Sequence, residues 1–235
     1  MATLYRHELK YLAPEPLLQV LEARVRAVMM PDRHAGSDGR YQIRSIYYDD
    51  LYDTCLRENE DGTDPREKFR VRSYNANSSV IHLELKQKQR GMCRKLSAPL
   101  SLEQCGQTMA GRIPDITDKD PALIRKWVAE MQVRHLHPVV VVTYDRDPFV
   151  WRQGNVRVTF DRNIRSSNEI GRFFDKDLPS RPVLPAGWHI LEVKWDELLP
   201  DFINEMLQTG LLRQTSFSKY YLCRAYARGV PHGFQ

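Results

Sequence analysis

Alternation between charged and apolar residues with a period of two is the feature of this sequence that most constrains its fold. Residues 68–72 read KFRVR, and residues 81–88 read IHLELKQK. The segments 4–10, 156–161 and 191–194 alternate in the same way. Because successive side chains of a strand point to opposite faces, each segment predicts a strand with one apolar and one charged face.

Hydrophobic periodicity and turn residues predict the remaining elements of an α+β fold. The expected strands cover residues 3–12, 41–49, 67–74, 80–89, 92–99, 138–150, 155–162 and 188–195. Amphipathic helices are expected at about 16–30, 101–110, 120–133, 199–212 and 216–228, with a short helix at 51–59 and an irregular stretch at 163–187. No repeat or linker-like stretch divides the chain, so residues 1–235 are expected to form a single domain.

Two arrangements of these strands fit the alternation. A half-buried sheet with its charged face in solvent is the commoner use of such a pattern. The alternative is an eight-stranded antiparallel tunnel-like β-barrel that is charged inside, with helices packed on its apolar outside. The several amphipathic helices need an apolar surface to cover, and the outer faces of such a barrel supply one.

The charge balance of the strand faces favours the barrel. The whole chain has 35 Lys and Arg against 30 Asp and Glu, a net charge of +5, and the strand faces alone carry an excess of this size. Like charges at 70 and 72 and at 86 and 88 would share a face on paired strands, where they repel unless an anion lies between them. The cations on these faces are Arg6, Lys10, Lys68, Arg70, Arg72, Lys86, Lys88, Arg146, Arg157 and Lys194, and the anions are Glu8, Glu84, Asp161 and Glu192.

An interior of this charge suits a ligand that is rich in phosphate. Guanidinium and ammonium groups neutralise phosphate oxygens, and isolated carboxylates hold a divalent cation that bridges phosphates. A nucleic acid is not expected, because a duplex cannot enter an eight-stranded barrel and aromatic residues are not interleaved with the basic positions. The sequence contains neither GxxxxGK[ST] nor GxGxxG, so neither a P-loop nor a dinucleotide site is expected.

Neither a membrane segment nor a secretory signal is expected. The longest purely aliphatic run, residues 139–142, is far shorter than the ~20 residues of a spanning helix. The first ten residues carry Arg6, Glu8 and Lys10 and contain no apolar core of a signal peptide. The four cysteines have no CxxC spacing, so reduced thiols and a cytoplasmic location are expected.

Eight short motifs carry a resemblance to a known family. They are RHELKY at 6–11, RSIYYD at 44–49, KFRVRSY at 68–74, LELK at 83–86, TYDR at 143–146, VRVTFD at 156–161, LEVK at 191–194 and SFSKY at 216–220. In this order, and over nearly the whole chain, they resemble the VTC-type polyphosphate polymerase domain, a branch of the triphosphate tunnel metalloenzymes (the CYTH-like superfamily). The resemblance implies an eight-stranded tunnel that transfers a phosphoryl group from ATP or another nucleoside triphosphate to a growing inorganic polyphosphate, with Mn²⁺ or Mg²⁺ as cofactor.

The resemblance also implies a role for individual residues. The group expected around the transferred phosphoryl is Arg70, Arg72, Lys86, Arg146 and Arg157. Further substrate-binding residues are expected at Lys10, Lys95, Ser218 and Lys219, with Glu192 and Glu8 as metal ligands. The strand-face pattern adds Lys88 and Lys194 as substrate-binding candidates and Glu84 as a third metal candidate.

Two positions depart from the pattern of the family. Arg6 stands where the ExExK strand of the superfamily has its first Glu, as in the polymerase branch and unlike the hydrolytic members. Ser216 stands where the polymerase helix motif has a Lys, which removes one cation of the tunnel. Two alternatives therefore stay open: a hydrolase of tripolyphosphate or nucleoside triphosphates, and a non-catalytic polyphosphate-binding module.

Overall fold

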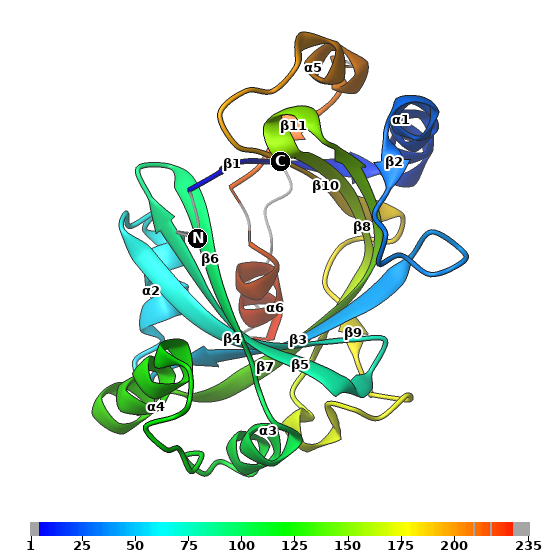
Figure 1. Ribbon diagram of the computed structural model, residues 1–235. Coiled ribbons are helices and arrows are strands. Elements are labelled where there is room, and N and C mark those ends of the chain that lie inside the picture. The colour runs from blue at the N-terminus through cyan, green and yellow to red at the C-terminus, as the bar shows by residue number, and fades with distance from the viewer. Residues whose placement is uncertain (1–4, 209, 217, 228–235) are drawn as a thin grey trace.

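An antiparallel sheet, curled strongly into a half-barrel, forms the centre of the molecule (Figure 1). The structure is a computed structural model that describes residues 5–208, 210–216 and 218–227. The long strands are β1 (His7–Pro14), β3 (Tyr41–Asp49), β4 (Arg66–Tyr74), β5 (Asn77–Gln89), β6 (Met92–Pro99), β7 (His137–Trp151), β8 (Val156–Ser167) and β10 (Trp188–Trp195). The two-residue strands are β2 (Met30–Pro31), β9 (Arg181–Pro182) and β11 (Arg213–Gln214).

Helices form at most of the positions where the sequence predicts them. They are α1 (Glu15–Val28), α2 (Thr54–Glu60), α3 (Leu102–Met109), α4 (Ala122–Arg134), α5 (Asp201–Leu207) and α6 (Lys219–Ala227), with single 3₁₀ turns at 153–155 and 170–172. The expected helix at 199–212 is shorter than predicted, because the chain leaves α5 to form β11. Within the described ranges, none of these helices combines the length and the apolar character that crossing a bilayer requires.

The long strands confirm the predicted α+β fold, but the prediction of a closed eight-stranded barrel is wrong. The strand order is β11-β1-β10-β8-β7-β3-β4-β5-β6, and β2 and β9 pair with β7 and β8, which makes eleven strands. Within the described part of the chain, the backbone of β6 pairs on this side only at an isolated bridge between Cys93 and Arg6, the residue before β1. The sheet is therefore open between β6 and β1.

Segment 213–215 pairs with the edge of β1 that borders the opening of the sheet. Strand β10 pairs with one edge of β1, and β11 pairs with Tyr11 and Leu12 on the other. The backbone N–H of Thr215 extends this contact by donating to the carbonyl of Lys10 at 2.8 Å. This edge of β1 is therefore shared between the bridge at Arg6 and segment 213–215, and β6 does not pair along it.

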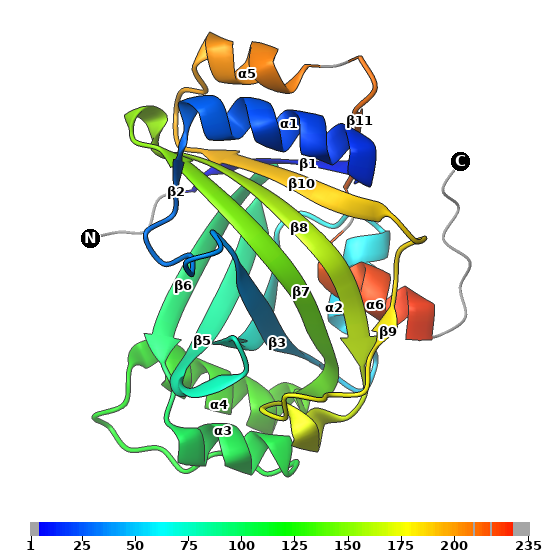
Figure 2. The same ribbon diagram turned by 90° about the vertical axis from the view of Figure 1, so that its right-hand side faces the viewer.

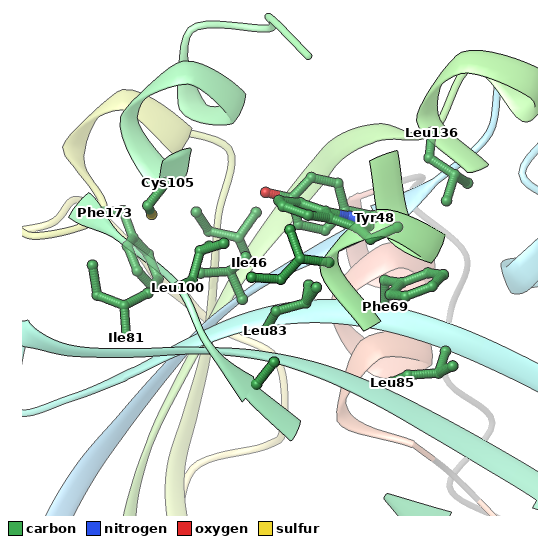
Figure 3. Close-up of a cluster of buried hydrophobic side chains, with 14 of the residues drawn as sticks. Ile46, Tyr48, Phe69, Ile81, Leu83, Leu85, Leu100, Cys105, Leu136 and Phe173 are labelled. Carbon is green, nitrogen blue, oxygen red and sulfur yellow. The ribbon is translucent and has the colours of Figure 1, made fainter. Parts of the chain in front are cut away.

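The apolar faces of the strands point outward and are covered by helices, as predicted. Phe69 and Leu85 pack with the fully buried Trp127 of α4 in a cluster that also includes Cys105 of α3 (Figure 3). At another part of the same outer face, α1 and α5 cover β1, β8 and β10 (Figure 2). Leu18 of α1 belongs to this second apolar cluster. Because neighbouring residues of a strand alternate, this arrangement turns the charged faces inward.

Helix α6 caps one end of the half-barrel rather than covering its outside. It lies within the ring of strands in Figure 1 and at one end of it in Figure 2. Its Tyr220 and Leu222 are fully buried and pack with Ile43 and Val142, which lie on the inner faces of β3 and β7. One end of the interior is therefore apolar, and the charged residues are confined to the remaining space.

Candidate functional site

Two adjoining cavities occupy the charged part of the interior. The inner cavity, of about 270 Å³, lies within the curl of the sheet. The side cavity, of about 550 Å³, lies between α2, β4, β5 and the segment 214–218. Both are lined by Glu8, Lys10, Lys68, Lys86, Cys93 and Ser218. The inner cavity is lined in addition by Arg6, His7, Tyr41, Tyr47, Arg70, Arg72, Tyr74, Arg94, Lys95, Tyr144, Arg146, Arg157, Glu192, Lys194 and Lys219. The side cavity is lined in addition by Cys55, Glu58, Asn59, Arg66, Glu67, Lys88, Gly91 and residues 214–216.

Positive charge is concentrated in the inner cavity. Twelve Lys and Arg side chains line it, against two carboxylates, Glu8 and Glu192. The side cavity is lined by five Lys and Arg and three Glu. The fold therefore brings the predicted cations together at one place inside the sheet, with no comparable excess in the side cavity.

Thirteen of the fourteen predicted site residues line one of the two cavities. Lys88 lines only the side cavity, where it lies near the turn between β5 and β6. Glu84 lines neither cavity and is 1% exposed. Ser216, where the polymerase motif has a Lys, is exposed at the rim of the side cavity.

Glu84 holds three of the predicted cations in place. Its carboxylate accepts from Arg70 Nε at 2.7 Å and from Lys95 Nζ at 2.9 Å, and Arg72 Nη1 lies 3.6 Å away. Burial alone would raise the pKa of Glu84, but Arg72, Arg70 and Lys95 hold that pKa well below its usual range. The Tyr47 hydroxyl accepts from Arg70 at 2.8 Å. The carboxylate is therefore ionised; it fixes the direction of the Arg70 guanidinium and forms a longer ion pair with Arg72.

A second cluster centres on Asp161, which is fully buried. Arg146 forms a bidentate pair with its carboxylate at 2.6 and 2.7 Å, and Lys219 Nζ lies 2.5 Å from Oδ2. Arg146 also donates to Glu192 at 3.0 Å. Burial favours the neutral acid, but Arg146 and Lys219 lower the pKa of Asp161 far below its usual range. This cluster links β7, β8, β10 and α6 at the inner cavity.

Glu8 and Glu192 form a carboxylate pair that Lys194 bridges. Lys194 Nζ lies 3.3 Å from Glu8 and 3.2 Å from Glu192. Glu8 also accepts from Lys86 and Lys10, both at 2.9 Å. Burial lowers the pKa of Lys194 to about 8, although Glu192 and Glu8 oppose the shift.

The two carboxylates fit a divalent cation that is shared with a phosphate ligand. In the described ranges, no three His, Cys, Asp or Glu side chains converge into a complete metal cluster. Mg²⁺ needs only one or two protein carboxylates when phosphate oxygens and water complete its coordination, and Mn²⁺ also favours oxygen ligands. Glu8 and Glu192 both line the inner cavity and supply such oxygens.

Two cations of the inner cavity pair with carboxylates that do not line it. Arg157 donates to the Tyr41 hydroxyl at 2.8 Å and pairs with Asp32 at 2.8 Å. Arg6 pairs with Asp196 at 2.6 Å, so this departure from the ExExK pattern places a guanidinium at the cavity wall.

Three groups at the site were not among the predicted site residues. Lys68 lines both cavities, and its position on the same strand face as 70 and 72 was the signal that could have found it. Asp161 also lay on a charged strand face, but only the fold shows that two cations hold it. The hydroxyls of Tyr47 and Tyr41 contact predicted cations, and no sequence signal distinguishes them from core tyrosines.

Comparisons with known proteins identify the fold and the family. A proposed adenylate cyclase from Bacillus halodurans has a similar structure, with a TM-score of 0.51, 13% identity and 90% of each chain covered. A proposed adenylyl cyclase from Hippeastrum, described as having a dominant triphosphatase activity, gives a TM-score of 0.49 at 12% identity, with 97% of this chain and 98% of that chain covered. Likeness at such identity shows the fold alone. No curated protein matches the chain. The model of the family described as the VTC domain matches residues 5–228, and the chain therefore belongs to the VTC domain family.

Proposed function

We propose that this VTC domain transfers the terminal phosphoryl group of ATP, or of another nucleoside triphosphate, to the end of an inorganic polyphosphate chain. The observation that supports this proposal is the lining of the inner cavity, in which twelve cations face two carboxylates. A linear polyphosphate carries negative charge along its whole length, and is narrow enough for a space of about 270 Å³.

The pairing of the cations supports an anionic ligand. Six carboxylates are shared by ten of the twelve cations that line the inner cavity, which leaves a large positive excess in the ligand-free protein. Burial of uncompensated charge is unfavourable, so a polyanion that enters gains strong electrostatic interactions. Arg70 and Arg146 are already oriented by Glu84 and Asp161, which lowers the cost of arranging them around phosphate oxygens.

Phosphoryl transfer needs positioning and charge stabilisation more than covalent chemistry from the protein. An oxygen of the polyphosphate end forms a bond to the γ-phosphorus of ATP, and the bond from that phosphorus to its bridging oxygen breaks. ADP leaves with the electron pair of that bond. In the proposed arrangement Arg70, Arg72, Lys86, Arg146 and Arg157 surround the transferred group and stabilise the charge on its oxygens.

The other candidate residues hold the two phosphate chains in line. Lys10, Lys95, Lys194 and Lys219 line the same cavity, and Ser218 lies where the inner and side cavities meet. Glu8 and Glu192 would hold Mn²⁺ or Mg²⁺, which supplies charge neutralisation of the triphosphate when bound. Glu84 is enclosed by three cations, so we assign it to orienting them.

Hydrolysis of tripolyphosphate or nucleoside triphosphates is the second candidate function of the same site. The side cavity favours it, because it adjoins the inner cavity at Lys68 and Ser218 and gives water a route to the same phosphoryl group. Arg6 favours the polymerase, because it replaces a carboxylate of the hydrolytic pattern with a cation at the cavity wall.

Incubation with ATP and Mn²⁺ or Mg²⁺, followed by gel sizing of polyphosphate, tests the proposal. We expect polymer that lengthens with time in the wild type and none in Arg70→Met. Arg125→Met is the matched control, because Arg125 is exposed on α4 and lines neither cavity. Orthophosphate release without polymer would establish hydrolysis instead. Polyphosphate binding without any ADP release would establish a binding module.

A further inference from the structure

Lys68 is a cation of the interior that has no carboxylate partner among the residues the structure describes. Its Nζ lies 3.2 Å from Ser218 Oγ, 3.5 Å from Asn59 Oδ1 and 5.0 Å from the centre of the Tyr220 ring. Over the described residues, no carboxylate oxygen lies within the 4.0 Å of an ion pair. The polar contacts of this ammonium are therefore with neutral oxygens.

The groups in contact with Lys68 are cations or neutral, and Glu58 and Glu67, which line the same side cavity, form no ion pair with it in the described structure; Glu67 pairs with Lys126 instead. Lys86 lies opposite it on β5, Lys10 approaches from β1, and Arg66 precedes it on β4. From α2 come Asn59 and the Cys55 thiol, and burial raises the pKa of that thiol, which keeps it neutral. From the α6 side come Ser218 and Tyr220. The nearby carboxylate of Glu8 is taken up by Lys10, Lys86 and Lys194.

Lys68 is also one of the six residues that line both cavities where they adjoin. A chain that passes from the inner to the side cavity would pass its amine and the Ser218 hydroxyl. A buried cation without a counterion is unfavourable, and a phosphate oxygen at this point would supply the missing charge.

We propose that Lys68 binds a phosphate group at the passage between the two cavities and takes up a proton from solvent when that group arrives. The proposal rests on the proposed function, because it assigns a further binding position to the same polyphosphate ligand. Ser218 is placed to serve both states, since its hydroxyl can accept from an ammonium or donate to a neutral amine.

The electrostatics of the ligand-free site support proton uptake. Burial, followed by the charges of Lys86 and Lys10, lowers the pKa of Lys68 to about 7. At pH 8 most of the amine is therefore neutral before ligand binds. A phosphate oxygen beside Nζ favours the charged form and raises this pKa. Because the complex then binds more protons than the free protein, affinity falls as pH rises above about 7.

Calorimetry with tripolyphosphate at pH 8, in two buffers of different ionisation enthalpy, measures the protons taken up on binding. The wild type should take up about one proton more than Lys68→Arg, whose guanidinium is already charged. Lys68→Arg should bind tripolyphosphate at pH 8 at least as tightly as the wild type. Lys68→Met should bind about tenfold more weakly or worse, because it loses a charge-assisted hydrogen bond.

Lys119→Met is the matched control, because Lys119 is exposed and outside both cavities, and it should behave as the wild type. Protonation of the ligand and of Lys194 contributes to every variant, so the difference from Lys68→Arg isolates Lys68. Equal proton uptake by the wild type and Lys68→Arg would overturn the proposal, as would unweakened binding by Lys68→Met. Proton-linked tripolyphosphate binding without phosphoryl transfer from ATP would overturn only the proposed polymerase function.

Discussion

Replacing Glu84 by Gln tests whether buried carboxylates stabilise the cations of the interior, and whether an anionic ligand can replace the charge of a missing carboxylate. Glu84 is 1% exposed, and it is the carboxylate partner of both Arg70 and Arg72 in the described structure. Gln keeps the size of the side chain, so the substitution removes the charge without opening a void. The two guanidinium groups then remain buried with no counterion.

The expected loss follows from the burial of that pair. Removing one partner of a buried ion pair costs about 3–5 kcal/mol, because the other charge is left uncompensated. For a chain of this length the loss corresponds to a fall in Tm of roughly 6–20 °C. Urea unfolding followed by tryptophan fluorescence measures the free energy, and thermal unfolding measures Tm. Tripolyphosphate should recover more stability in Glu84→Gln than in the wild type, because it replaces the missing charge.

Glu67→Gln is the matched control on the neighbouring strand. Glu67 is half-buried and pairs with Lys126, which is 40% exposed, so its loss should cost at most about 1 kcal/mol. A free energy of unfolding for Glu84→Gln within about 1 kcal/mol of the wild type would refute the reasoning. Equal stabilisation of both proteins by tripolyphosphate would refute the idea that the ligand takes over the role of the carboxylate.

Three further outcomes test other parts of the site. Glu192→Gln should raise the Mn²⁺ or Mg²⁺ concentration for half-maximal ADP release by about tenfold or more, and an unchanged metal requirement would contradict the assignment. The free energy of unfolding should fall as pH drops below about 4.3, because cations hold the pKa values of Glu8 and Glu84 below those of the unfolded chain. Urea unfolding between pH 7 and pH 3 measures this fall. A free energy of unfolding that stays constant over this range would contradict the prediction. Tripolyphosphate at a hundred times its Kd should add about 2.7 kcal/mol to the free energy of unfolding at pH 7. Added salt should weaken this stabilisation. A Tm that does not change with the ligand would exclude specific binding.

The alternation of β4 and β5 predicted their faces well, because a period of two leaves no freedom in side-chain direction. Phe69 and Leu85 lie outside against the helices, and Arg70 and Lys86 lie inside, as expected. The pattern by itself does not say which face is enclosed. The concentration of cations on one face supplied that information, because so many like charges need a common counterion.

Closure of the sheet could not be predicted in the same way. It depends on how far β6 pairs along β1, and the single bridge between Arg6 and Cys93 leaves no periodic pattern to detect. The prediction of a closed barrel therefore failed between β6 and β1, where backbone pairing in the described structure is limited to this bridge.

The partners of the buried cations could not be predicted from the sequence either. Asp161 was visible as an acid on a strand face, but its pairing with Arg146 depends on the register of β7 with β8, which shifts between Thr143 and Asp145. The contact of Lys68 with Ser218 depends on where α6 enters the half-barrel. Such contacts join distant parts of the chain, and local patterns do not encode them.

The central claim is that the charged interior binds polyphosphate and extends it from ATP. The most direct measurement follows the γ-phosphoryl label of ATP in the presence of Mn²⁺ and the wild-type protein. The account predicts that the label enters polyphosphate chains of growing length, with one ADP released for each label incorporated. Label that appears only as orthophosphate, or that stays in ATP, would contradict it.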